Sequence, residues 1–236
     1  MTDLHDALET LYASLQVLEG KLGGRRRLSD CHGRMPWPSH GIYLFFEDGE
    51  WREDGRTLRV VRVGTHALTA RSRTTLWQRL SQHRGNVGGT NPGGGNHRGS
   101  VFRLHVGTAL INRDGWEGAA PTWGEGSSTP REVRDREAEL EKAVSQHIGA
   151  MPFLWLSVPD REERGSIERD LIALLSGARR AHADPASPRW LGLHADRPAI
   201  RESSLWNVNH TNDAFTGDGL ELFVRRVDDV TTGQGS

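Results

Sequence analysis

The sequence predicts an α+β fold in which a small antiparallel sheet is flanked by helices. Two short apolar runs, 42–46 and 58–63, are separated by a polar turn, and their spacing favours an antiparallel hairpin. A third apolar run over 153–158 predicts a central strand of the same sheet. Leucines recur at helical spacing over 3–22, and apolar residues do so over 166–175, so each segment predicts a helix that packs outside the sheet.

Further helices are predicted along the chain. Residues 75–83 are predicted to form a short helix, and residues 218–228 are predicted to form a final one. Residues 101–111 fit both an alternating strand and a helical spacing, and we favour the helix. The segment 129–148 starts like a capping box, with Pro130 in the first turn of the helix. Its clustered glutamates predict a solvated face with i,i+4 ion pairs rather than a metal site.

A glycine-rich stretch interrupts these elements. Seven glycines lie between residues 85 and 99, without the spacing or the lysine of a phosphate-binding P-loop. Two interpretations are about equally supported: a flexible basic loop that folds over a substrate, and a disordered insertion. We divide the chain into an N-terminal helix and basic linker (1–30), a main domain (31–215) with an insertion at about 85–128, and a C-terminal short helix and tail (216–236).

The composition excludes several classes of protein. A length of 236 residues and a hydrophobic content of 35% allow one domain with loops. Cys31 is the only cysteine, which excludes a disulfide framework and a cysteine-based zinc finger. No apolar run approaches the ~20 residues of a membrane span, and Asp3, Asp6 and Glu9 stand where a signal peptide has its apolar core. We expect a cytoplasmic protein that binds no membrane.

The net charge of −1 hides a strongly basic segment. Residues 55–113 contain ten arginines and no acidic residue. Such a segment is typical of proteins that bind a polyanion, because phosphate contacts supply most of the affinity for nucleic acid. Lysine is rare in the chain, so codon preference is an alternative source of arginine. It does not explain the missing carboxylates, and we therefore predict nucleic acid as the partner.

Three short sequence motifs occur in a fixed order within the basic segment and just before it. They are Gly41-Ile42-Tyr43, then Arg62-Val63-Gly64 followed closely by His66, and then a helix with Arg79 four residues before His83. On that helix the guanidinium and the imidazole can converge on one site. A planar cation neutralises phosphate charge and an imidazole relays a proton, so the pair suits phosphoryl chemistry. His66 is a further candidate for the same pocket.

In this order the motifs resemble the GIY-YIG nuclease family, and the resemblance covers roughly residues 40–210. It implies a three-stranded antiparallel sheet on which Tyr43 faces the scissile phosphate. Arg62 stands in place of the family's second tyrosine, so the chain is similar to a divergent branch. An arginine can anchor a phosphate but hardly accepts a proton, because its pKa is above ~12. Some restriction enzymes of the family have a pair similar to Arg79 and His83 on this helix.

The resemblance also implies a metal site. GIY-YIG enzymes use one glutamate, on a helix after the third strand, as their sole protein ligand to the metal, and Glu168 is our choice for it. A carboxylate at the edge of a core is costly unless a partner such as Mg²⁺ or Mn²⁺ balances it. The alternative is a boundary glutamate paired with a neighbouring arginine. Family members often have a supporting asparagine after this helix, and the sequence does not rank Asn207 against Asn209.

We therefore expect a metal-dependent endonuclease that hydrolyses nucleic-acid phosphodiesters, with DNA favoured. The expected catalytic side chains accept a proton from water or stabilise the charge on phosphate, and they are Tyr43, His66, Arg79 and His83. One Mg²⁺ on Glu168 would stabilise the leaving oxygen. The side chains expected to contact nucleic acid are Arg62, Arg84, Arg98, Asn207 and Asn209.

Two alternatives stay open. The first is an inactive nucleic-acid-binding module on the same fold, which has lost its chemistry through the replacement at Arg62. The second, more distant one is an enzyme that acts on another substrate in the same pocket. No separate target-recognition domain is evident, so specificity must come from the loops, the N-terminal helix or a partner.

Overall fold

The computed structural model describes residues 4–179 and 184–231, so the end of the predicted C-terminal tail lies outside the described residues. Its centre is an antiparallel sheet with the strand order β1-β4-β2-β3. The strands are β1 (Arg26–Arg27), β2 (Gly41–Trp51), β3 (Leu58–Gly64) and β4 (Pro152–Ser157). The α+β fold and the central third strand are confirmed. The prediction of three strands is wrong by one, because two arginines of the basic linker pair with the outer edge of β4.

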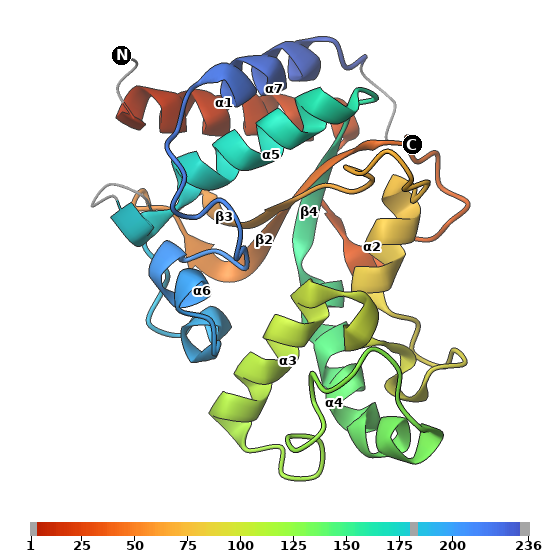
Figure 1. Cartoon of the computed structure of the whole chain (residues 1–236). Helices are drawn as coiled ribbons and strands as arrows, with labels where there is room; N and C mark the ends of the chain where they lie inside the picture. Colours follow the sequence, from red (N-terminus) through yellow and green to blue (C-terminus); the bar gives the residue numbers. More distant parts are fainter. Residues whose placement is uncertain (1–3, 180–183, 232–236) are drawn as a thin grey trace.

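The α-helices are α1 (Leu4–Leu22), α2 (Leu76–Arg84), α3 (Val101–Asp114), α4 (Arg131–Ala150), α5 (Arg161–Leu175), α6 (Pro198–Ser203) and α7 (Asp218–Asp228). Short 3₁₀ turns occur at 28–30, 92–94, 97–99, 177–179 and 191–194. Figure 1 shows α1, α5 and α7 packed together on one side of the sheet, with α3 and α4 forming a separate pair on the other side. The helix favoured over 101–111 is confirmed as α3.

Two element boundaries differ from the sequence prediction. Strand β2 continues through the segment expected to be a turn, because Trp51 pairs with Leu58 after register shifts that follow Phe45. The turn is therefore confined to 52–57. Helix α4 has no capping box: Pro130 is its N-cap and makes no side-chain cap bond, since a proline side chain has no acceptor.

The glutamates of α4 correct a second expectation. The exposed ends of the helix do have solvated charges, but Glu137 and Glu141 are buried. Glu137 binds both terminal nitrogens of Arg98, at 2.7 and 2.9 Å. Glu141 accepts bonds from the guanidinium of Arg103 and, at 2.7 Å, from the backbone N–H of His97. These carboxylates lie inside the fold because each has a cationic partner there.

The same contacts anchor the glycine-rich segment. Gly94 and Gly95 are buried, and the N–H of Asn86 bonds to the Gly94 carbonyl across the loop. A Cβ at Gly95 would overlap the Arg103 guanidinium, and one at Gly93 would overlap the carbonyl of Ala138 on α4. The segment 85–99 is thus fixed against α3 and α4, in place of the flexible loop or disordered insertion expected from its composition.

A single core joins the two sides of the sheet. Its buried apolar residues extend from Ala7 on α1 to Val227 on α7, and they come from β2, β3 and β4 and from every helix longer than eight residues. Among the residues that the structure describes, no helix is long and apolar enough to cross a membrane.

Candidate active site

Tyr43 and His83 lie together beneath the surface. The Tyr43 hydroxyl is 2.8 Å from Nε2 of His83, and Nδ1 of His83 is 2.8 Å from the hydroxyl of Ser100. The tyrosine and the histidine are fully buried. Burial lowers the pKa of His83 well below its ordinary value, and the charges of Arg79, Arg62 and Arg103 lower it further. The imidazole is therefore neutral near pH 7, with one nitrogen on the tyrosine and the other on the serine.

The two glycines of the strand ends make room for this arrangement. Gly64 pairs directly with Tyr43 across the β2–β3 ladder. A Cβ at Gly64 would lie 2.5 Å from the ring carbon and the hydroxyl oxygen of Tyr43, well inside van der Waals contact. A Cβ at Gly41 would overlap the Leu156 carbonyl on β4. The absence of a side chain at Gly64 lets the Tyr43 ring lie across β3 and point at α2, while the glycine at position 41 lets β2 and β4 lie close together.

We expect Gly64→Ala to move Tyr43 away from His83. Overpacking of a filled core costs about 1–3 kcal/mol, so thermal unfolding should shift down, and any activity that uses Tyr43 should fall with it. Gly20→Ala is the matched control, because nothing lies within 4 Å of its added Cβ and it sits within α1. If the Gly64→Ala protein were as stable as the Gly20→Ala protein, the close contact between Gly64 and the Tyr43 ring would be contradicted.

Arg62 occupies the position of the second motif tyrosine, beside Tyr43. Its Nη1 donates to the Trp206 carbonyl at 2.6 Å, and its guanidinium lies 4.5 Å from the centre of the Phe102 ring. Burial lowers its pKa, and the Nε atom is buried with no hydrogen-bond partner. No carboxylate forms an ion pair with Arg62 among the described residues, so its charge is not neutralised by a direct ion pair there.

Glu168, on α5, lies close enough to this group for the charges of Arg62 and Arg79 to act on its carboxylate. Its Oε1 accepts a bond of 3.1 Å from the backbone N–H of Thr65, just after β3. Burial raises the pKa of Glu168, and this effect outweighs the opposite pull of Arg62 and of His210. The charged carboxylate is therefore held in a place that solvates it poorly.

Arg79 and His66 have different positions relative to this group. Arg79 is partly exposed, donates to Gln82 at 3.2 Å, and is close enough to lower the pKa values of His83 and Glu168. His66 is a structural link. Its Nδ1 bonds to the Thr74 carbonyl at 2.7 Å, its Nε2 accepts from the Gly41 N–H at 3.3 Å, and burial lowers its pKa to about 4. Both ring nitrogens of His66 are thus bound to backbone.

A family model for the GIY-YIG domain matches residues 2–233. The chain belongs to the GIY-YIG family. Members of this family are typically nucleases that use a divalent metal. No curated protein and no solved structure matches the chain. The match extends beyond the segment 40–210 in which the motifs lie and includes α1 and α7, the outer helices.

The structure separates the two candidate asparagines of this GIY-YIG domain. Asn207 is buried beside β3, where its side-chain oxygen accepts from the Val63 N–H at 3.1 Å and its nitrogen donates to the Val63 carbonyl at 2.8 Å. Asn209 is exposed. Asn207 therefore continues the hydrogen bonding of the sheet edge next to Arg62. Both polar atoms of its side-chain amide are bonded to the backbone of Val63.

The basic segment of the GIY-YIG domain is partly neutralised in the fold. Carboxylates from outside the segment form buried pairs with some of its arginines, namely Arg59–Glu50, Arg98–Glu137 and Arg103–Glu141. Arg98 is thus held inside the structure by Glu137. Arg71 and Arg73 are exposed and, like Arg79, have no ion pair within the described ranges 4–179 and 184–231. Positive charge without an ion pair within the described residues thus lies in the loop before α2 and on α2, in addition to the buried Arg62 and to Arg56 in the β2–β3 turn.

Sequence reasoning missed three participants. Ser100 caps α3, and its hydroxyl contacts His83. The N–H of Thr65 holds Glu168, and His210 contributes to the field at that carboxylate. A serine before a helix is a recognisable N-cap signal, but nothing in the local sequence shows which histidine it faces.

Proposed function

We propose that this protein is a metal-dependent endonuclease that hydrolyses nucleic-acid phosphodiesters, with DNA as the favoured substrate. The supporting observation is the bond of 2.8 Å between the Tyr43 hydroxyl and the neutral, buried His83, with Arg62 and Glu168 close by. A phenol bonded to an imidazole can pass a proton on, and a nearby cation and carboxylate suit a phosphodiester and a metal.

The proton path uses the side chains in sequence. If Nδ1–H of His83 donates to the Ser100 hydroxyl, Nε2 is left as the acceptor of the Tyr43 proton. An attacking water then gives a proton to the Tyr43 oxygen as Tyr43 gives its own to His83. The water oxygen forms its bond to phosphorus, the P–O bond to the leaving oxygen breaks, and the leaving oxyanion takes a proton from bulk water. The proton on His83 returns to solvent through Tyr43 before the next turnover.

Arg62 and Arg79 stabilise the charge that this attack develops. Arg62 is buried with an unused Nε–H donor, so its field is weakly screened by water. Arg79 is more exposed and is placed to meet the phosphate at the entrance. Fixed donors aimed at developing charge are worth more in such a site than in water.

Glu168 is the residue that would hold the metal. Within the described residues no cluster of three metal-ligating side chains occurs, but Mg²⁺ commonly binds through one or two carboxylates together with waters and phosphate oxygens. A single carboxylate whose charge is poorly solvated fits that mode, since a cation would balance it. When bound, the metal supplies Lewis-acid stabilisation of the leaving oxygen.

The decisive experiment incubates the protein with supercoiled plasmid in Mg²⁺, in Mn²⁺ and in chelator. We expect nicked and linear products with either metal and none with chelator. Tyr43→Phe should slow cleavage by about 100-fold or more, because it removes the proton acceptor. Tyr12→Phe is a matched control: Tyr12 is the only other tyrosine, it is buried, and its hydroxyl accepts from the Val60 N–H at 3.0 Å.

The control separates chemistry from folding. Both variants lose one buried hydrogen bond, so both should lose about 1 kcal/mol of stability, while only Tyr43→Phe should lose cleavage. Equal cleavage by the two variants would contradict the role of Tyr43. Salt-sensitive binding with no cleavage in either metal would instead support an inactive nucleic-acid-binding module.

A further inference from the structure

Two adjoining hollows lie between α2, the glycine-rich segment 85–99 and the C-terminal half of α4. One has a volume of about 580 Å³ and reaches His32 and Asn96 at its outer rim. The other has a volume of about 400 Å³ and extends to Arg27 and Gln146. Both are lined by Arg84, Gly85 and Asn86, so they adjoin at these residues, and we call the two together the α2–α4 groove.

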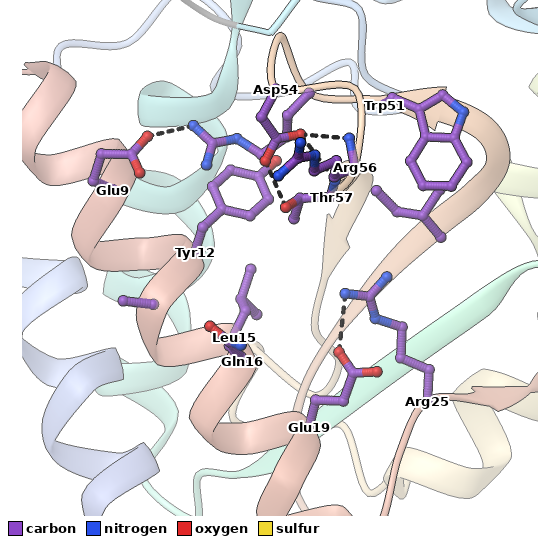
Figure 2. Close-up of a pocket in the computed structure, with 13 residues that line it drawn as sticks. Glu9, Tyr12, Leu15, Gln16, Glu19, Arg25, Trp51, Asp54, Arg56 and Thr57 are labelled. Atoms are coloured by element: carbon purple, nitrogen blue, oxygen red, sulfur yellow. Dashed lines mark hydrogen bonds and ion pairs between the residues drawn. The ribbon is translucent and has the colours of Figure 1, made fainter.

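Among the residues that the structure describes, no carboxylate lines the α2–α4 groove. The cleft between α1 and the β2–β3 hairpin provides a contrast, and Figure 2 shows its acidic side chains facing its arginines. There Arg52 is paired with Glu9 at 2.6 Å, and Arg25 is paired with Glu19 at 3.0 Å. A hollow beside α7 is lined by Glu221 and Asp228. Among these described hollows, the α2–α4 groove is the one whose charge suits an anion.

Arg84 lies at the junction of the two hollows with unused donors. Its Nη2 donates to the Ser29 carbonyl at 3.2 Å, and its Nε is buried with no partner. No acidic side chain forms an ion pair with it within the described residues. A guanidinium in this state can offer a fork of donors to a phosphate without first breaking an ion pair.

The remaining lining suits bases and a sugar-phosphate backbone. Asn86, Asn91 and Gln82 offer amides, which donate and accept at base edges. Gly85 and Gly95 have no side chain to keep a strand away. The indole of Trp77, which is itself stacked on Trp37 at 5.2 Å between ring centres, gives an aromatic wall.

Helix α2 connects this groove to the active site. Trp77, Ser81 and Arg84 follow each other at helical spacing and face the groove. Arg79 and His83 are on the side of the same helix that meets Tyr43. One nine-residue helix therefore separates the groove from the reacting group, so a nucleic acid bound at Tyr43 can continue across α2 into the groove.

We infer that the α2–α4 groove binds the part of the nucleic-acid substrate that flanks the cleaved bond. Arg84 contacts a phosphate, and the amides of the glycine-rich segment contact the bases. The inference rests on the proposed function for the identity of the ligand, but it concerns binding rather than chemistry. It makes the segment 85–99 a wall of the binding site rather than a lid.

The test measures binding of a fluorescent DNA duplex in chelator, by anisotropy at several salt concentrations. Arg84→Gln should weaken binding by about 10-fold at about 0.1 M salt, and should reduce the slope of log affinity against log salt by about 1. Arg56→Gln is the matched control, because Arg56 is exposed and lines the acidic cleft of Figure 2. The same measurement with an RNA duplex of the same sequence shows whether the groove prefers the phosphates of DNA or those of RNA.

The outcomes separate this inference from the proposed function. Plasmid cleavage with unchanged binding by Arg84→Gln would overturn the groove and leave the nuclease. Weakened binding by Arg84→Gln in a protein that never cleaves would support the groove and overturn the nuclease. If Arg84→Gln unfolds, the double variant Asn86→Ala and Asn91→Ala, on the exposed wall, replaces it: a changed distribution of cleavage sites supports the groove, and an unchanged one overturns it.

Discussion

Replacing Glu168 by glutamine should reduce metal-dependent cleavage by about 1,000-fold or more, because a neutral amide binds Mg²⁺ far more weakly than a carboxylate does. The loss should not come from unfolding. The amide oxygen of glutamine can still accept the Thr65 N–H, and burial disfavours the charged form of Glu168 in the wild-type protein. Thermal unfolding should therefore stay within about 2 °C of wild type or move upward.

Glu162 provides the matched control on the same helix. Its side chain is 88% exposed, and its only ion pair within the described part of the chain is a 4.0 Å contact with its neighbour Arg161. Glu162→Gln should change neither cleavage nor stability measurably. Full plasmid cleavage by Glu168→Gln in Mg²⁺ would remove Glu168 from the metal site. A large drop in melting temperature would show instead that Glu168 is a structural ion-pair partner.

Replacing Arg103 by methionine should destabilise the protein by about 3–5 kcal/mol, the usual cost of breaking a buried ion pair from one side. For a chain of this size that is a decrease of about 6–20 °C in melting temperature. Arg103 is fully buried, and its donors reach the carboxylate of Glu141, the Ser145 hydroxyl at 3.0 Å and the His83 carbonyl at 2.9 Å. Without the cation, Glu141 keeps a buried charge supported only by His97.

A double-mutant cycle measures the coupling energy between Arg103 and Glu141. Arg103→Met with Glu141→Met should be less destabilised than the sum of the two single variants, because it leaves neither charge alone in the core. Arg131→Met is the exposed comparison, since its partner Asp135 lies 3.7 Å away and its side chain is 83% exposed. A loss of stability at Arg103 no larger than the loss at Arg131 would contradict the structure.

The elements that carry the motifs could be predicted because their signals are local. The strand of Tyr43 is an apolar run, and the helix of His83 begins at a capping box formed by Thr75 and Gln78. Gly64 could be recognised as a motif residue. The reason that a glycine is needed there could not, because the Tyr43 ring lies against it only once the two strands have paired. The fold class follows from such signals, while the candidate site residues come from the order of the motifs and their resemblance to the family.

The rest could not be predicted because the partners are distant in the chain. Glu137 and Glu141 have the spacing of a solvated helix face, and only Arg98 and Arg103, 39 and 38 residues earlier, make them core residues. The same holds for Asn207, which bonds to Val63 across 144 residues, while Asn209 two positions later is exposed. Pattern and composition do not encode such pairings.

The contact between Gly95 and Arg103 has a consequence for how the domain can change its target. Arg103 also bonds to the carbonyl of His83, so the base of the glycine-rich segment and the backbone of the active-site helix share one side chain. Any side chain at Gly95 would displace that guanidinium. The exposed tip at 86–90 has no such link. Natural variation or library design that alters which substrates bind is therefore tolerated better at the exposed Asn86, Val87 and Thr90 than at position 95, which accepts only glycine.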